Sequence, residues 1–129
     1  MTNSLVLIVD DDPAIRAFLR RVLRLSGLEV LEAADGGSGL ELALAEPAGA
    51  VILDYNLPDT DGLSVLQRLK ARKPALPVLF LTAYGEPELE RRALELGADL
   101  FHSKPMTLDA LLRAVRQLLE RPPAGGPGP

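Results

Sequence analysis

The feature that most constrains the fold of this chain is a fivefold alternation between a short apolar run and a longer amphipathic segment. The apolar runs cover residues 5–9, 30–33, 50–53, 78–81 and 100–101. Most are apolar at every position, which is typical of strands buried on both faces in a parallel sheet. We therefore predict an α/β fold, in which right-handed crossovers place helices on both faces of an open sheet of five parallel strands.

The segments between these runs carry the periodicity of helices that bury one face. The clearest stripes have apolar residues three and four positions apart, at Ile15, Phe18, Leu19, Val22 and Leu23 and again at Leu108, Leu111, Leu112, Val115, Leu118 and Leu119. Asp12 followed by Pro13 is typical of a helix start, with an N-cap and a proline at the first helical position. Gly27 and Gly97 stand where two helices should end, because glycine tolerates the left-handed cap conformation.

Composition narrows the class of protein. The 129 residues suit one domain, and with aromatic residues at only 4% the core must be aliphatic. The lack of cysteine excludes disulfides, and a net charge of −4 argues against direct nucleic-acid binding. No apolar stretch is long enough for a membrane span and no secretion signal is evident, so we expect a cytoplasmic protein. We expect one domain over residues 1–121 and a loose Pro/Gly-rich tail over 122–129.

Polar side chains follow the apolar runs at their carboxyl ends, where ligands bind in open α/β sheets. Asp10 and Asp11 follow the first run, Asp54 the third, Thr82 the fourth and Lys104 the fifth. Three carboxylates and one ammonium sum to −3 + 1 = −2, the charge that one divalent cation would cancel. Oxygen ligands without histidine or cysteine favour Mg²⁺, with Mn²⁺ as a second candidate. A carboxylate can itself attack phosphorus, and phosphoryl transfer then needs mainly charge neutralisation and positioning.

Four segments carry a family resemblance. They are VLIVDDDPAIR (6–16), ILDYNLPDTDG (52–62), LFLTAYG (79–85) and GADLFHSKP (97–105). In this order and spacing they resemble the signature blocks of bacterial two-component response-regulator receiver domains, and the resemblance covers residues 5–121. It implies a flavodoxin-like, doubly wound sheet with the strand order 2-1-3-4-5.

The resemblance also implies roles at the site. Asp54 looks like the phosphoacceptor and a metal ligand. Asp10 and Asp11 look like the metal-binding acidic pair, with Asp11 the direct ligand, and the backbone carbonyl of Asn56 is a further ligand. Lys104 resembles the phosphate-contacting lysine.

Two further positions resemble the switch of the family. Thr82 matches the switch hydroxyl and Phe101 the switch aromatic, and the peptide before Pro105 is typically cis. The implied function is a phosphoacceptor switch that takes a phosphoryl group from a histidine kinase or phosphotransfer protein and changes its binding face toward an unidentified effector. It would assist its own phosphorylation and dephosphorylation without being a turnover enzyme. Pairing of two copies stays open, as does whether the chain acts alone or belongs to a longer regulator.

Three other functions compete with this reading. A phosphatase resembling the haloacid-dehalogenase family needs a second aspartate two residues after the nucleophile, where this chain has Asn56. A flavin or nucleotide carrier needs a Gly- or Ser/Thr-rich phosphate loop after the first strand, where this chain has three aspartates. A receiver that no longer takes phosphate is disfavoured because the set of site residues is complete.

Other polar residues have simpler interpretations. Asp12, Asp35 and Asp61 are expected to cap helices or form turns, and the single His102 has no partner histidine for a metal. Tyr84 is expected either to overhang the site and slow hydrolysis or to serve as surface cover. The arginines crowded into the first helix, Arg16, Arg20, Arg21 and Arg24, form either a solvated face relieved by Glu29 or Glu32 or a docking surface for a kinase domain.

Overall fold

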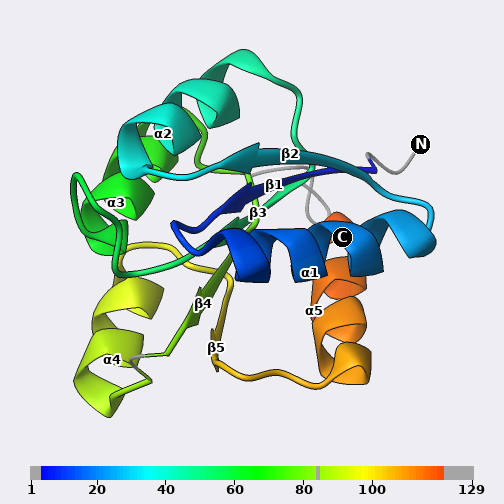
Figure 1. The fold of residues 1–129 in the computed structure, drawn as a ribbon. Helices are drawn as coiled ribbons and strands as arrows, with labels where there is room; N and C mark the ends of the chain where they lie inside the picture. Colours follow the sequence, from blue (N-terminus) through cyan, green and yellow to red (C-terminus); the bar gives the residue numbers. More distant parts are fainter. Residues whose placement is uncertain (1–3, 84, 121–129) are drawn as a thin grey trace, which may run out of the picture.

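The computed structural model describes residues 4–83 and 85–120, and in it the five apolar runs form one sheet. Its strands are β1 (Leu5–Val9), β2 (Glu29–Ala33), β3 (Ala50–Leu53), β4 (Val78–Thr82) and β5 (Leu100–Ser103). Their spatial order is β2-β1-β3-β4-β5, and every neighbouring pair is parallel (Figure 1). The predicted doubly wound sheet and its strand order are confirmed.

Within the described residues, five helices cover the two faces of this sheet (Figure 1). They are α1 (Pro13–Leu25), α2 (Gly36–Ala45), α3 (Gly62–Arg72), α4 (Pro87–Glu95) and α5 (Leu108–Glu120). Leu23 of α1 and Val115 of α5 belong to one core cluster, while Ala43 of α2, Leu66 of α3 and Ala93 of α4 belong to another. The sheet therefore separates two apolar layers, as expected for a doubly wound fold.

The β1 strand shows why the apolar runs do not alternate with polar residues. Val6 and Ile8 pack into the α1–α5 layer, whereas Leu7 and Val9 pack into the layer of α2, α3 and α4. Because successive side chains point to opposite faces, both faces of a central strand must be apolar.

The edge strands are less apolar than the central ones, and this is where the predicted boundaries were too narrow. Strand β2 begins one residue earlier than predicted, at Glu29, and β5 continues through His102 and Ser103. Both added stretches contain exposed polar residues, because an edge strand has a solvent-facing side. The central strand β4 also runs one residue further, to the buried Thr82.

The predicted helix ends are confirmed. The Asp12 carboxylate accepts a 2.9 Å hydrogen bond from the amide of Ala14, and Pro13 opens α1. Gly27 and Gly97 follow helices in the left-handed region, with φ of 86° and 109°. The expected caps at Asp35 and Asp61 are also present, since each carboxylate accepts an amide hydrogen bond from a serine in the first turn of its helix.

One residue of the predicted α1 stripe does not belong to the core. Phe18 is 52% exposed, whereas Leu19, Val22 and Leu23 of the same helix are buried. The apolar stripe is wider than the surface that the sheet covers, and Phe18 lies at its edge. Among the described residues, no helix has the length and hydropathy to span a membrane. The predicted tail at residues 122–129 lies outside the described residues.

Candidate functional site

The carboxyl ends of four strands bring the predicted site residues together. The Asp54 amide donates a 3.0 Å hydrogen bond to the carbonyl of Val9, so the first residue after β3 lies beside the end of β1. The Lys104 amide donates a 2.9 Å hydrogen bond to the carbonyl of Thr82, which joins the end of β5 to the end of β4. Parallel pairing therefore aligns residues that are far apart in the sequence on one edge of the sheet.

Three carboxylates form an acidic cluster at this edge. Oxygen atoms of Asp10, Asp11 and Asp54 all lie within 4.8 Å of one another. Asp10 and Asp54 are buried, while Asp11 is exposed at the mouth of the cluster. Two ligand atoms on opposite sides of one Mg²⁺ would be about 4.2 Å apart, twice the usual Mg–O distance of ~2.1 Å. The cluster thus has the spacing and the oxygen-only chemistry of a site for a small divalent cation.

The Lys104 ammonium lies between two of these carboxylates. Its Nζ atom is 2.6 Å from Asp10 Oδ2 and 3.4 Å from Asp54 Oδ2. One positive charge facing three carboxylates leaves the site with −3 + 1 = −2. This excess negative charge favours a divalent cation at the exposed side of the cluster, where Asp11 lies.

The environment of the Asp54 carboxyl group raises its pKa above the ordinary value. Burial raises its pKa, the Lys104 ammonium acts in the opposite direction, and the Asp10 carboxylate raises the pKa further. The amide of Tyr55 donates a 2.8 Å hydrogen bond to Asp54 Oδ1, and the Thr82 hydroxyl donates a hydrogen bond to the same carboxyl group. The Asp54 carboxyl group therefore accepts hydrogen bonds from Tyr55 and Thr82 and also lies beside the charges of Lys104 and Asp10.

The loop between β3 and α3 carries Asn56, two residues after Asp54, and folds back on itself before α3 begins. Asn56 forms an isolated antiparallel bridge with Asp61, and the Gly62 amide donates a 2.6 Å hydrogen bond to the carbonyl of Tyr55. A Cβ atom at position 62 would overlap the carbonyl oxygen of Asp54. Only glycine leaves room for the return of the chain at this point, which explains the Asp-Gly pair that opens α3.

The predicted switch residues lie on the neighbouring strands. Thr82 is fully buried at the end of β4. Phe101 of β5 is half-buried and stacks on the buried Phe80 of β4, with ring centroids 5.7 Å apart and planes inclined by 10°. The Lys104–Pro105 peptide bond is cis. Tyr84 lies outside the described residues.

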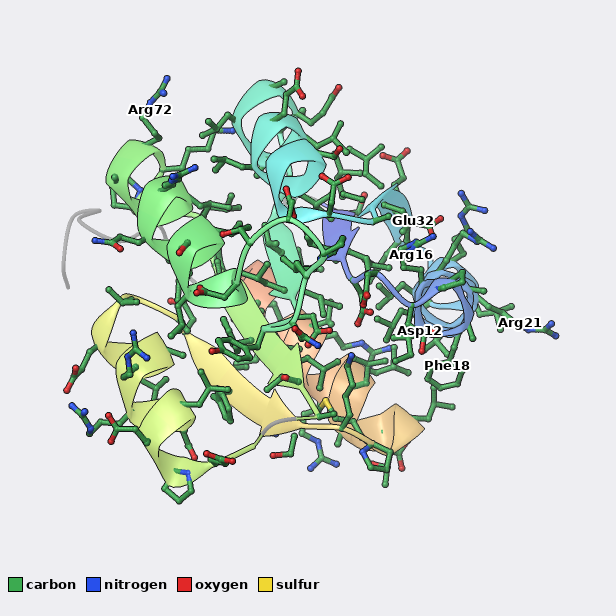
Figure 2. The ribbon with its side chains drawn as sticks, turned by 60° about the vertical axis from the view of Figure 1, so that its left-hand side comes forward. Asp12, Arg16, Phe18, Arg21, Glu32 and Arg72 are labelled. Atoms are coloured by element: carbon green, nitrogen blue, oxygen red, sulfur yellow. The ribbon has the colours of Figure 1, made fainter. Side chains whose placement is uncertain are left out.

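The sequence did not predict the contact of Arg16 with the backbone of Asp10. Its guanidinium donates a 2.7 Å hydrogen bond to the backbone carbonyl of Asp10 and lies 3.5 Å from Glu32. Figure 2 shows Arg16 beside Glu32, while Arg21 on the far side of α1 points away from the protein. The expected relief of arginine charge by Glu32 is thus confirmed for Arg16 and Arg20, which lies 2.6 Å from the same carboxylate. The position of Arg16, one turn into the helix after the acidic run, was the available signal.

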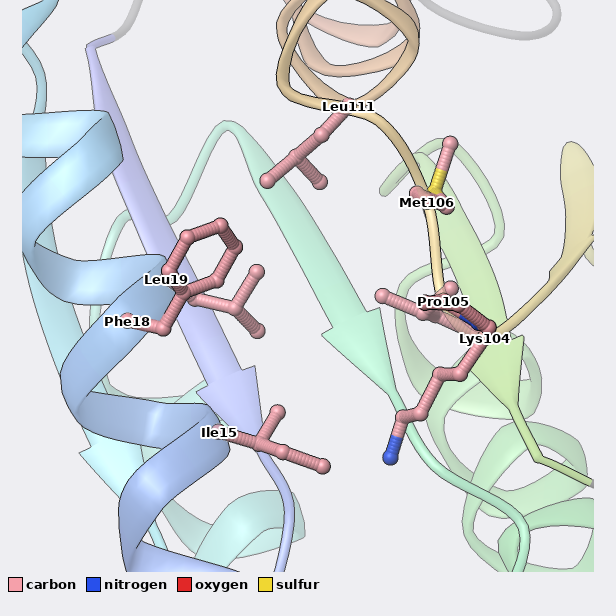
Figure 3. A pocket seen from close by; sticks show the side chains of 8 residues that line it. Ile15, Phe18, Leu19, Lys104, Pro105, Met106 and Leu111 are labelled. Carbon is pink, nitrogen blue, oxygen red and sulfur yellow. The ribbon is translucent and has the colours of Figure 1, made fainter.

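An apolar pocket of about 160 Å³ lies next to the site, between α1 and the segment that joins β5 to α5. Figure 3 shows side chains of α1 on one side of the pocket and those of the joining segment on the other. Its lining includes Phe18, Leu19, Lys104, Pro105 and Met106. Lys104 thus borders both this pocket and the acidic cluster.

The chain is similar to known proteins over nearly all of its length. The family model described as the response regulator receiver domain matches residues 6–116. The chain is 41% identical over 121 residues to the transcriptional regulatory protein PrrA of Mycobacterium tuberculosis. This match covers 94% of this chain and 52% of PrrA. It is 35% identical over 119 residues to sporulation initiation phosphotransferase F of Bacillus subtilis, covering 92% of this chain and 96% of that protein. The chain therefore spans about half the length of relatives such as PrrA and nearly all of the phosphotransferase.

A solved structure agrees with these relatives. The crystal structure of a CheY-like response regulator receiver domain protein from Methanospirillum hungatei superimposes with a TM-score of 0.88 at 32% identity, covering 91% of this chain and 94% of that one. The family model, the relatives and the strand order agree, and the chain belongs to the response-regulator receiver domains of two-component signalling.

Proposed function

We propose that this protein is a phosphoacceptor switch in which Asp54 receives the phosphoryl group. The observation that carries the proposal is the environment of the Asp54 carboxyl group, which has the Thr82 hydroxyl and the Lys104 ammonium beside it. A hydroxyl and an ammonium at this position suit the oxygens of an attached phosphoryl group, because phosphoryl transfer depends mainly on positioning and charge neutralisation.

We further propose that Mg²⁺, or Mn²⁺ in its place, binds at Asp10, Asp11 and Asp54 with the backbone carbonyl of Asn56. Both Asp10 oxygens already accept hydrogen bonds, from the Asp12 amide at 2.9 Å and from Lys104 at 2.6 Å. The exposed Asp11 is therefore the better direct ligand of the acidic pair. When bound, the cation would supply positive charge against the phosphoryl oxygens.

The transfer forms one bond and breaks one. An oxygen of Asp54 attacks phosphorus, and the P–N bond to a histidine of the donor breaks. The released imidazole keeps the electron pair of that bond and takes up a proton. Lys104 and Thr82 hold the phosphoryl oxygens, and hydrolysis of the aspartyl-phosphate later returns the carboxylate. The protein acts on its own side chain in both steps and is not a turnover enzyme.

The partner that brings the phosphoryl group is a histidine kinase or a phosphotransfer protein, and we propose that it docks on the apolar pocket beside α1. The exposed Phe18 borders this pocket, which ends at Lys104 of the site. A helix packed here would reach the acidic cluster without disturbing the core. The arginines of α1 that face solvent, such as Arg21, would flank it.

Phosphorylation would then change the conformation of Thr82 and Phe101. Attachment of a phosphoryl group to Asp54 would move the hydroxyl of Thr82 from the carboxylate to a phosphoryl oxygen, and Phe101 on the neighbouring strand would repack. The changed face of α4 and β5 would bind a downstream effector. The acidic net charge disfavours direct contact of this domain with nucleic acid, and a cytoplasmic place would fit its kinase partner.

The experiment that tests the acceptor compares wild type with Asp54→Asn and with Asp61→Asn, a change in the same loop that keeps an oxygen acceptor for the helix cap. Each protein is incubated with acetyl phosphate and Mg²⁺ and analysed by intact mass. Wild type and Asp61→Asn should gain the mass of one phosphoryl group that hydroxylamine removes, and Asp54→Asn should not. Equal modification of Asp54→Asn would place the acceptor elsewhere.

A further inference from the structure

The side chain of Asp59, in the loop between β3 and α3, binds the N-terminus of the neighbouring helix α2. Asp59 Oδ1 accepts a 2.7 Å hydrogen bond from the amide of Gly36, and Asp59 Oδ2 accepts a 2.9 Å hydrogen bond from the amide of Gly37. Both amides belong to the first turn of α2, where backbone N–H groups lack partners within the helix and favour negative charge. These two hydrogen bonds lower the pKa of Asp59, so its carboxylate stays ionised in the contact.

The contact is close because α2 begins with glycines. A Cβ atom at Gly36 would overlap Thr60 of the loop and lie 2.9 Å from Val65 Cγ2. A Cβ atom at Gly39 would lie 2.7 Å from Val9 Cγ1. The first turns of α2 are therefore pressed against the β3–α3 loop on one side and against the last residue of β1 on the other.

The end of β1 and the β3–α3 loop, which α2 contacts, are the two segments that carry the residues of the metal site. Val9 directly precedes Asp10, and the loop that carries Asp59 also carries Asn56. The contacts within the loop, such as the bridge between Asn56 and Asp61, set its own shape. The hydrogen bonds of Asp59 instead reach 22 and 23 residues along the chain and tie the loop to a helix that rests on β1.

We propose that Asp59 is a positioning residue for the metal site, holding the backbone of Asn56 at the distance from Asp10 and Asp11 that one cation requires. This inference rests on the proposed function, because it assumes that Mg²⁺ binds among these residues. Asp59 itself does not touch the cation or the phosphoryl group. Its loss lets the loop move away from α2 and weakens Mg²⁺ binding while the core stays folded.

The test uses a matched control at the same helix. Asp35 also caps α2, through a 2.7 Å hydrogen bond from the amide of Ser38, but it is not part of the β3–α3 loop. Wild type, Asp59→Ala, Asp59→Asn and Asp35→Ala are titrated with Mg²⁺ while backbone amide NMR signals around Asp54 are followed. The thermal midpoint of each variant is measured alongside. Phosphorylation by acetyl phosphate is the second readout.

We expect Asp59→Ala to weaken Mg²⁺ binding about tenfold, the low end of the loss that follows removal of a supporting residue around a metal site. Asp59→Asn keeps one acceptor and should recover part of this loss, and Asp35→Ala should bind Mg²⁺ like wild type despite a similar fall in thermal midpoint. Equal affinities of Asp59→Ala and Asp35→Ala would overturn the inference alone. A wild type that neither binds Mg²⁺ nor takes up phosphate would overturn the proposed function, and the inference with it.

Discussion

Lys104 and Asp10 form a 2.6 Å ion pair between residues 94 positions apart in the chain, across the full distance from the end of β5 to the end of β1. Strands β3 and β4 lie between β1 and β5 in the sheet, so this pair joins the two sides of the site. Both side chains are largely buried, and neither charge has full access to water.

Replacing Lys104 by methionine should leave the carboxylates of Asp10, Asp11 and Asp54 to repel one another without the nearby positive charge. Without divalent cations, we expect Lys104→Met to lower the free energy of unfolding by about 1–3 kcal/mol at neutral pH, because buried carboxylates lose their charged partner. Mg²⁺ should stabilise this variant more than it stabilises wild type, since the cation replaces the missing positive charge. Lys73→Met is the control, because the Lys73 ammonium donates hydrogen bonds to the backbone carbonyls of Ala43 and Glu46 at the end of α2 and not to the cluster. The measurement is chemical denaturation with and without Mg²⁺, and an equal Mg²⁺ effect in all three proteins would contradict the prediction.

The raised pKa of Asp54 makes its contribution to stability depend on pH. Burial raises this pKa in the folded protein, so the folded state binds the proton more tightly than the unfolded state does. The protonated Asp54 carboxyl group thus favours the folded state. This stabilisation is fully present below the pKa that Asp54 has in the unfolded state, and it is lost as pH rises through the higher pKa that Asp54 has in the folded state. Asp54→Asn should therefore gain stability relative to wild type as pH rises toward neutrality and lose that advantage in acid. Denaturation of both proteins across this pH range, with a chelator present, measures the difference; a difference independent of pH would show that burial does not disfavour the carboxylate.

Asp11 and Asp12 are neighbours with different predicted roles. Asp11→Ala should abolish Mg²⁺ binding and phosphorylation while leaving the fold as stable as wild type or more so, because it removes one of three crowded carboxylates. Asp12→Ala should keep Mg²⁺ binding and lose about 1 kcal/mol of stability, because it removes the N-cap of α1. Mg²⁺ titration followed by NMR, together with chemical denaturation, separates the two effects. Unchanged Mg²⁺ affinity in Asp11→Ala would remove this residue from the metal site.

The exposed Phe18 should matter for a protein donor and not for a small one. We expect Phe18→Ser to slow phosphoryl transfer from a phosphorylated histidine kinase by about tenfold, equivalent to ~1.4 kcal/mol at a docking residue. Phosphorylation by acetyl phosphate should be unchanged, because that donor needs no docking surface. Leu94→Ser serves as the control, since Leu94 is an exposed apolar residue on α4, away from the pocket. A parallel loss with both donors would indicate damage to the site in place of docking.

The stacked pair of Phe80 and Phe101 offers a readout of the switch. On phosphorylation, NMR signals of Phe101 and of α4 should shift, because the hydroxyl of Thr82 exchanges its carboxylate partner for a stronger, charge-assisted contact with the phosphoryl group. Thr82→Val keeps the shape of the side chain without the hydroxyl, so it should still accept phosphate while these distant shifts shrink. Shifts confined to the acidic cluster in wild type would argue against this route for the signal.

Much of this protein could be predicted from local patterns in its sequence. The central strands, the caps at Asp12, Asp35 and Asp61, and the left-handed glycines each depend on residues within one turn or one strand. The strand ends that carry the site could be found in the same way, because parallel strands place their carboxyl ends at one edge. The predicted boundaries of β2 and β5 were too narrow, because edge strands tolerate polar residues that the apolar pattern does not include.

The sequence by itself determined the order of buried and exposed segments, and with it the sheet and the set of side chains at its edge. Only the tertiary structure decided which groups far apart in the chain meet and which apolar side chains stay exposed. The exposure of Phe18, the reach of Asp59 to Gly36 and Gly37, and the pairing of Lys104 with Asp10 all depend on how whole elements pack. Periodicity reports which face of an element is apolar, but contacts between residues distant in the chain are set by the packing of helices on the sheet.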